Sequence, residues 1–150
     1  IKEPQMANLN LAQVIGYLGE DATRTVLSNK DIKYTFSIAT SDKWKDKMTG
    51  EQRSNTEWHK IETIVKSTVG EGLHTFYKNI LRKGKATWVS GKMRSSKYEL
   101  EGVARVKHYI EVNRMAGGDI QPLEARKDST DSPFKSAEET QNAHDDDISF

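Results

Sequence analysis

The chain lacks cysteine, and it also lacks any long run of apolar residues. Without cysteine it has no disulfides and no thiolate zinc sites, which suits a reducing compartment. No stretch approaches the roughly 18 consecutive apolar residues that a membrane helix needs. The first residues, Ile1-Lys2-Glu3-Pro4, contain no apolar signal region. We therefore expect a cytoplasmic protein with no membrane association.

Motifs for catalysis, metal binding or nucleotide binding are also missing. The four histidines form no HExxH pair, and no glycine-rich segment has P-loop spacing. Gly70-Glu71-Gly72 lacks the remainder of a dinucleotide-binding fingerprint. The carboxylates between residues 1 and 115 are scattered, which disfavours a metal-dependent nuclease. The sequence therefore predicts a protein that is not an enzyme and has no cofactor and no bound metal.

What the chain does have is a charge that is unevenly divided. The whole chain has a formal net charge of +1, from 23 basic and 22 acidic residues. Residues 1–115 contain 20 basic and 13 acidic side chains, net +7, and residues 116–150 contain 3 and 9, net −6. We therefore expect a basic domain over residues 1–115 that binds an anionic partner. An acidic tail follows this domain.

Hydrophobic periodicity predicts three strands in the first half of the chain. Residues 9–18 are mostly apolar, and residues 32–39 alternate between large apolar and smaller or polar side chains. Residues 56–65 alternate as well, which places Trp58, Lys60 and Glu62 on the face opposite Ile61. The polar segments 20–31 and 41–55 are expected to be loops, with a turn at Thr49-Gly50.

A helix and two further strands are predicted in the second half. Apolar residues spaced three and four apart predict an amphipathic helix over 69–83, and Gly84 provides its stop. Residues 86–97 and 103–113 are expected to be strands joined at Glu101-Gly102. The predicted fold is therefore mainly β, a five-stranded Greek-key barrel of the OB type with one helix between strands 3 and 4. From residue 116 onward we expect a disordered linker, 116–144, and an acidic tip, 145–150.

Three aromatic residues lie in basic surroundings and are the most informative feature for function. Trp44 is in a lysine-rich segment, Trp58 shares a strand face with Lys60, and Tyr98 follows a basic run. Exposed rings beside cations suit single-stranded nucleic acid, because bases stack on the rings while Lys and Arg neutralise phosphates. Packing of these rings into the barrel core is the alternative.

Several segments of the chain are informative as an ordered set. They are Ile15-Gly16-Tyr17-Leu18-Gly19-Glu20-Asp21, Phe36-Ser37-Ile38-Ala39-Thr40-Ser41-Asp42-Lys43-Trp44, Lys45-Asp46-Lys47-Met48-Thr49-Gly50-Glu51, Thr56-Glu57-Trp58-His59-Lys60, Leu81-Arg82-Lys83-Gly84, Gly91-Lys92-Met93-Arg94 and the C-terminal Asp145-Asp146-Asp147-Ile148-Ser149-Phe150. In their order and approximate spacing over about residues 8–113 they resemble the bacterial single-stranded DNA-binding protein family, and the last segment resembles the acidic tip of that family.

The resemblance implies a homotetramer around which single-stranded DNA wraps without sequence preference, in replication, recombination and repair at the nucleoid. It implies base stacking on Trp44, Trp58 and Tyr98, and His59 at a subunit interface. The positions that it implies for phosphate contact are Lys45, Lys47, Lys60, Lys66, Arg82, Lys83, Arg94 and Lys97. The tip residues Asp145, Asp146, Asp147, Ile148, Ser149 and Phe150 are implied to bind partner proteins of these pathways.

The chain departs from the family pattern at several positions. Ile64 stands where the family usually has a stacking Phe, and Ser149 replaces a Pro in the tip. An OB-fold scaffold, or a module that binds RNA or an oligosaccharide, remains the alternative function, because the fold serves all of these ligands.

Overall fold

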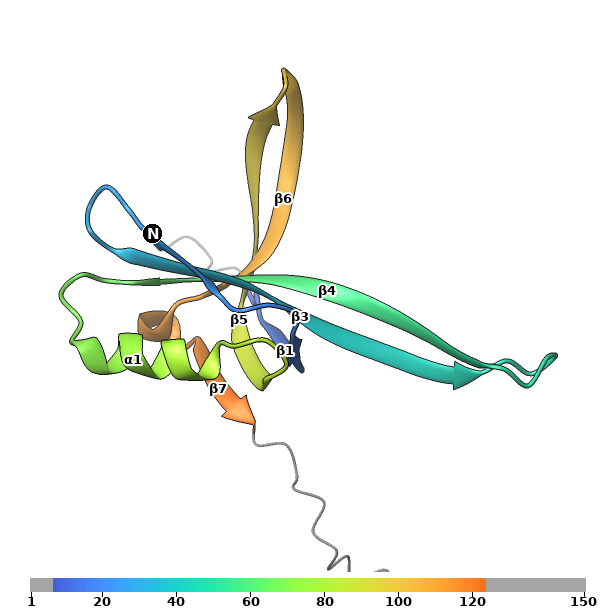
Figure 1. The fold of residues 1–150 in the computed structure, drawn as a ribbon. Coiled ribbons are helices and arrows are strands. Elements are labelled where there is room, and N and C mark those ends of the chain that lie inside the picture. Colours follow the sequence, from blue (N-terminus) through green and yellow to red (C-terminus); the bar gives the residue numbers. More distant parts are fainter. Residues whose placement is uncertain (1–6, 124–150) are drawn as a thin grey trace, which may run out of the picture.

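Five strands of the chain close into a barrel (Figure 1). The protein's structure is a computed structural model that describes residues 7–123. Each strand pairs with the next in the order β1-β3-β4-β6-β5, and β5 pairs back to β1. All these pairings are antiparallel except β4 with β6, which is parallel. The barrel strands are β1 (Ala12–Leu18), β3 (Ile32–Lys45), β4 (Gln52–Val65), β5 (Ala86–Leu100) and β6 (Val103–Val112). The predicted mainly-β barrel is confirmed.

Two short strands were not predicted. β2 (Thr23–Val26) pairs with β3 inside the segment that was expected to be a loop. β7 (Asp119–Leu123) pairs with β5 after the short 3-10 helix η1 (Arg114–Ala116), so the expectation of disorder from residue 116 is wrong for this segment. All four residues of β2 are exposed, and in β7 only Ile120 is buried. Such strands are held mainly by backbone pairing, and they leave little hydrophobic pattern in the sequence.

The helix α1 (Glu71–Ile80) lies between β4 and β5, which are the third and fourth strands of the barrel. It is shorter than the predicted 69–83, and the backbone N–H of Leu81 caps it on the carbonyl of Tyr77. Tyr77 and Leu81 are buried, and Leu73, Phe76 and Ile80 pack against the core. The predicted apolar stripe of the helix is therefore confirmed.

The barrel core follows the predicted alternation. Ile32, Tyr34, Phe36 and Ile38 are all buried along β3. Gly16 and Gly91 allow strands to cross closely. A Cβ at Gly16 would lie 2.1 Å from the carbonyl oxygen of Ala39, and one at Gly91 would lie 2.3 Å from that of Glu111. Any side chain at these two crossings would collide with backbone.

Two hairpin arms extend beyond the barrel (Figure 1). β3 and β4 remain paired out to Lys45 opposite Gln52, so the predicted loop over 41–55 is wrong and only residues 46–51 connect the strands. The arm has no core to face, so both of its sides are polar and the period-two signal is lost there. β5 and β6 form the second arm, which turns at Glu101-Gly102 as predicted.

Within residues 7–123, no helix is long and apolar enough to cross a membrane. The predicted linker from residue 124 onward and the tip at 145–150 lie outside the described residues.

Candidate nucleic-acid interface

One outward face of the barrel carries the aromatic and basic residues of β4. Side chains alternate along a strand, so Trp58, Lys60 and Glu62 lie on the face opposite the core residue Ile61. Trp58 is 58% exposed and Lys60 is exposed as well, which confirms their predicted orientation. Trp58 is thus available to a ligand and is not part of the hydrophobic core.

The Trp58 ring is placed by a glycine on a neighbouring segment. A Cβ at Gly19 would lie 2.5 Å from Cζ3 and 2.7 Å from Cη2 of the indole, closer than any side chain allows. Trp58 and Gly19 line one hollow of about 570 Å³ on the outer face. The other lining residues of this hollow are Glu20, Asp21, Thr23, Thr35, Phe36, Ser37, Lys60, Glu62 and Lys107.

A charged pair that the sequence pattern did not predict lines this hollow. Nζ of Lys107 on β6 donates to Oε1 of Glu62 on β4, and it lies 4.9 Å from the centroid of the Tyr109 ring. Glu62 is only 9% exposed, so Lys107 compensates a nearly buried carboxylate. Alternation along residues 103–113 could have placed Lys107 and Tyr109 on one face. The pairing of Lys107 with Glu62 required knowledge of the parallel contact between β4 and β6.

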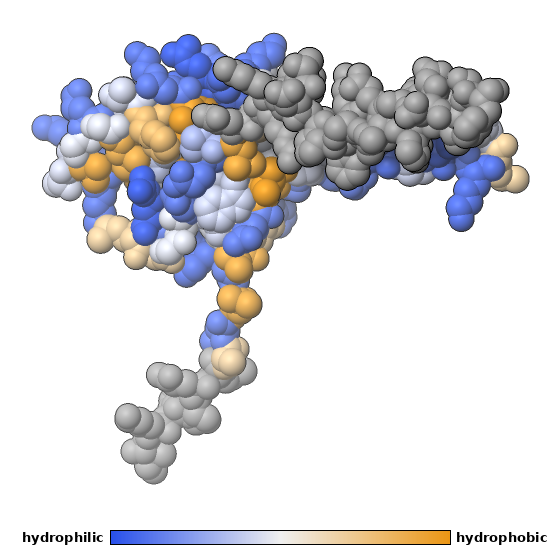
Figure 2. All heavy atoms as spheres, turned by 90° about the horizontal axis from the view of Figure 1, so that it is seen from below, coloured by the Kyte–Doolittle hydropathy of each residue, from blue (hydrophilic) through white to orange (hydrophobic). Residues whose placement is uncertain are grey.

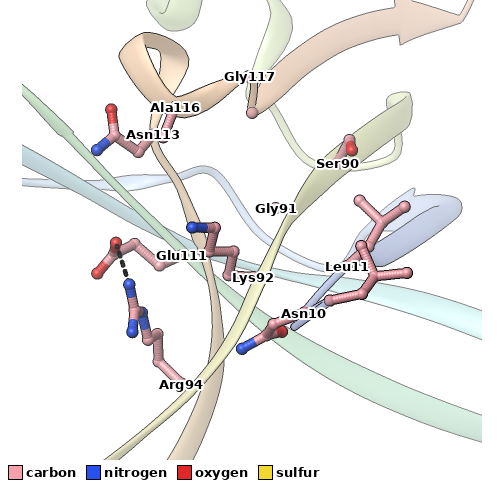
Figure 3. A pocket seen from close by; sticks show the side chains of 12 residues that line it. Asn10, Leu11, Ser90, Gly91, Lys92, Arg94, Glu111, Asn113, Ala116 and Gly117 are labelled. Atoms are coloured by element: carbon pink, nitrogen blue, oxygen red, sulfur yellow. Dashed lines mark ion pairs between the residues drawn. The ribbon is translucent and has the colours of Figure 1, made fainter. Parts of the chain in front are cut away.

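The second arm continues this outer face. Arg94 and Tyr98 alternate onto one side of β5, and Tyr98 is 45% exposed and paired with Arg105 on β6. Arg94 forms an ion pair of 3.7 Å with Glu111 on β6 (Figure 3). Lys97, at an odd position in β5, lies on the opposite side of the arm.

Trp44 is exposed, but it is not gathered with Trp58. It is 48% exposed on the first arm, opposite Arg53 of β4. Ala39 of β3 is the residue paired with Trp58, and the odd and even positions of a strand point to opposite faces. The two tryptophans therefore lie on opposite faces of the β3–β4 ribbon. Lys45 ends β3 and Lys47 lies in the connecting loop, both exposed.

The remaining predicted cations surround the helix end of the barrel. Lys66 follows β4 and lines a second hollow, which includes Ile64 and Met115. Arg82 and Lys83 follow α1, and the backbone N–H of Lys83 donates to Oδ1 of Asp21 at 2.8 Å. Positive charge is thus distributed around the barrel instead of forming one cluster.

His59 lies on the face of β4 that carries Ile61. Its Nε2 is 2.8 Å from Oγ1 of Thr40, and the ring is half-buried. The tip residues Asp145 to Phe150 lie outside the described residues.

The buried hydroxyl of Tyr77 is affected by its surroundings. Burial raises the pKa of the Tyr77 hydroxyl above its ordinary value, while the nearby Arg114 acts in the opposite direction. Among residues 7–123, no three His, Asp or Glu side chains are grouped as a metal site would require.

Apolar side chains also reach the surface of the barrel body, among hydrophilic ones (Figure 2). Those on β1 and just before it include Leu11, Ile15 and Tyr17, exposed by 58%, 61% and 58%. Exposed apolar residues gathered on one strand are typical of surfaces that contact another protein chain.

A five-stranded closed barrel with this strand order is the OB fold, and here its surface carries exposed aromatic rings and cations. The sequence profile of the Single-strand binding protein family matches residues 9–117, and the chain belongs to this family. The Single-stranded DNA-binding protein 1 of Xylella fastidiosa is 35% identical over 111 residues, which are 73% of this chain and 77% of that protein.

Two solved structures share the fold. The Plasmodium falciparum SSB in complex with ssDNA superposes with a TM-score of 0.64 at 27% identity, covering 80% of this chain and 99% of that chain. A deletion mutant of the single-stranded DNA binding protein from Thermus aquaticus gives a TM-score of 0.58 at 19% identity. The match covers 79% of this chain and 52% of that chain, and at this identity it shows a shared fold alone.

Proposed function

We propose that the protein binds and protects single-stranded DNA, without catalysis, during replication, recombination and repair. The observation that carries this proposal is the exposed Trp58 ring, seated on Gly19 and flanked by Lys60 and Lys107 in one hollow. A flat ring beside cations holds a base by stacking and a phosphate by charge, and both interactions tolerate any sequence. Family membership and the DNA-bound relative support the same ligand.

In this proposal, bases stack on Trp58, Tyr98 and Trp44. Trp58 and Tyr98 lie on the outer face of the barrel and second arm, and Trp44 extends the path onto the first arm. DNA that stacks on both tryptophans has to pass from one face of the ribbon to the other, which suits a strand that wraps. The proposed phosphate contacts are Lys45, Lys47, Lys60, Lys66, Arg82, Lys83, Arg94 and Lys97.

Tryptophan fluorescence tests the proposal directly. Titration with oligo(dT) should quench the emission strongly, because bases stack on Trp44 and Trp58. Duplex DNA of equal length should quench weakly, and both effects should weaken with salt. Equal binding of duplex DNA would overturn the proposal. Efficient displacement of oligo(dT) by an RNA or a glycan would instead favour the alternative RNA- or oligosaccharide-binding function.

We also propose that the protein assembles as a homotetramer. The exposed apolar side chains of β1, among them Ile15 and Tyr17, suit a contact with a second copy of the chain. The half-buried His59 is proposed to lie at a subunit interface. Light scattering after size exclusion should give four times the mass of the chain, and Ile15→Asp should lower that mass. A monomer at all concentrations would contradict this assembly.

The last six residues are proposed to recruit replication, recombination and repair proteins. Three carboxylates followed by Ile148 and Phe150 combine charge with apolar anchors at the end of the chain. We propose that this role is carried out in the cytoplasm, at the nucleoid. A peptide of these six residues should compete with the full chain for such a partner, and a peptide without Phe150 should compete weakly.

A further inference from the structure

The two hairpin arms leave the barrel in different directions, and they separate at a fork between β4 and β6 (Figure 1). The last pair of these two strands on the arm side is Ile61 with Ile110. Beyond it β4 continues along β3 and β6 continues along β5. Lys60 and Tyr109 are the first residues past this pair, so they lie at the fork. Alternation places both on the outer face that carries Trp58.

Tyr109 lies between two of the proposed base-stacking rings. Trp58 is two residues beyond Lys60 on β4. Tyr98 is paired with Arg105, which is four residues beyond Tyr109 on β6. These six strand positions span about 20 Å at the usual rise, which leaves room for several nucleotides with stacked bases about 3.4 Å apart. A DNA strand that follows the outer face from Trp58 to Tyr98 therefore passes the fork.

The Tyr109 ring is partly accessible and has cations around it. The residue is half-buried and lies outside the hydrophobic core cluster. Nζ of Lys107, which is held by Glu62, lies 4.9 Å from the ring centroid. Arg94 is the residue paired with Tyr109 on β5, and it forms the 3.7 Å ion pair with Glu111. An ammonium occupies at most one face of a ring, so the exposed part of the ring can take a base while the cations neutralise phosphates.

We propose that Tyr109 is a further base-stacking platform, which supports single-stranded DNA as it crosses the fork from Trp58 to Tyr98. The inference rests on the proposed function, because it requires single-stranded DNA on the outer face. Stacking uses the flat side of a base and not its edge, so this platform accepts every base. Lys60 and Arg94, both proposed as phosphate contacts, lie on the strands to either side of it.

The alternative role for Tyr109 is packing within the sheet. A tyrosine can stabilise a sheet through its cross-strand neighbour, here Arg94, without touching a ligand. Loss of the ring would then lower Tm and leave DNA affinity unchanged. The proposed platform makes the opposite prediction, which is a loss of affinity with little change in Tm.

Replacement of the ring separates the two roles. Tyr109→Leu keeps an apolar side chain without a ring, so it should weaken binding of short oligo(dT) about tenfold in anisotropy titrations. Tyr109→Phe keeps the ring and should bind like the wild type. His108→Leu is the matched control, because it removes an exposed ring from the opposite side of β6 and should leave affinity unaltered. Wild-type affinity in Tyr109→Leu, or an equal loss in Tyr109→Phe, would overturn the inference.

A second measurement uses the unaltered protein, so it does not depend on the folding of a variant. Oligo(dT) with one 5-iododeoxyuridine at successive positions is irradiated in the complex, and the iodinated base couples to aromatic side chains on which it stacks. Mass spectrometry should locate adducts on Tyr109 as well as on Trp58 and Tyr98. Adducts on Trp58 and Tyr98 with none on Tyr109 would refute this inference and leave the proposed function standing. Failure of oligo(dT) to bind would refute both.

Discussion

At the scale of single residues, the two exposed tryptophans should contribute to binding and not to folding. Trp58→Ala and Trp44→Ala should each weaken single-stranded DNA binding by about 1 to 3 kcal/mol, the usual loss of a stacking platform. The rings are 58% and 48% exposed, so Tm should change little. Anisotropy with labelled oligo(dT) and thermal melts measure the two effects. A collapse of Tm would assign that ring a structural role.

Gly19 should matter for binding through Trp58. A methyl group at Gly19 would meet the indole at 2.5 Å, so Gly19→Ala should displace the ring and weaken oligo(dT) binding by about 1 kcal/mol. Gly72→Ala is the control, because nothing lies within 4 Å of its Cβ position in α1. That change should raise the free energy of unfolding by about 0.5 to 1 kcal/mol and leave DNA affinity unaltered. Wild-type affinity in Gly19→Ala would show that the ring position is not set by this contact.

Tyr77 should make stability depend on alkaline pH. Burial raises the pKa of its hydroxyl in the folded state, so its contribution to stability is complete below the unfolded pKa of about 10 and is lost as pH rises through the folded pKa. Among the described residues the hydroxyl has no hydrogen-bond partner. Tyr77→Phe should therefore leave the free energy of unfolding at pH 7 unchanged or raise it. In this variant the free energy of unfolding should also fall less steeply as the pH rises above about 10. Urea unfolding at increasing pH measures both, and an equally steep loss in the variant would exclude Tyr77 as the cause.

At the scale of secondary structure, the turn of the second arm should be open to stabilisation. Glu101 and Gly102 have φ of 52° and 76°, the left-handed pair that a two-residue type I′ turn requires. Asparagine tolerates this region better than glutamate, so Glu101→Asn should raise the free energy of unfolding by about 0.5 kcal/mol. Glu99→Asn, at an ordinary strand position opposite Ala104, should give no gain. Urea midpoints compare the two variants.

The strands that could be predicted from the sequence are those with one buried face. Ile32, Tyr34, Phe36 and Ile38 alternate because the core selects every second residue of β3. The outer part of the same strand, from Ser41, is exposed on both faces, so no such selection acts there. β2 and β7 are held by pairing at the edges of other strands, which composition does not reveal.

The candidate site likewise has residues that could be predicted from the sequence and contacts that could not. Trp58 and Lys60 follow from alternation within one strand. The pairing of Lys107 with Glu62, 45 residues apart, depends on the parallel alignment of β4 and β6. The separation of Trp44 from Trp58 depends on the register of β3 with β4. Local periodicity contains neither kind of information, because both are properties of chain topology.

At the scale of the whole molecule, the division of charge should govern how strongly DNA binds. Residues 1–115 are net +7 and residues 116–150 are net −6. An acidic segment tethered to a basic domain is present at high effective concentration, so it competes with DNA phosphates for the same cations. This competition is electrostatic and should fade as salt shortens the screening length.

Deletion of the last six residues should therefore leave DNA affinity equal or higher, with the gain largest at low salt. Replacement of Asp145, Asp146 and Asp147 by Asn is the matched variant, because it removes the charge and keeps Ile148 and Phe150. Both variants should bind oligo(dT) alike, whereas only the deletion removes the apolar anchors proposed for partner binding. Anisotropy over a range of salt concentrations measures the first effect, and competition with the six-residue peptide measures the second. Weaker DNA binding after the deletion would mean that the tip contributes to the DNA interface and does not compete with it.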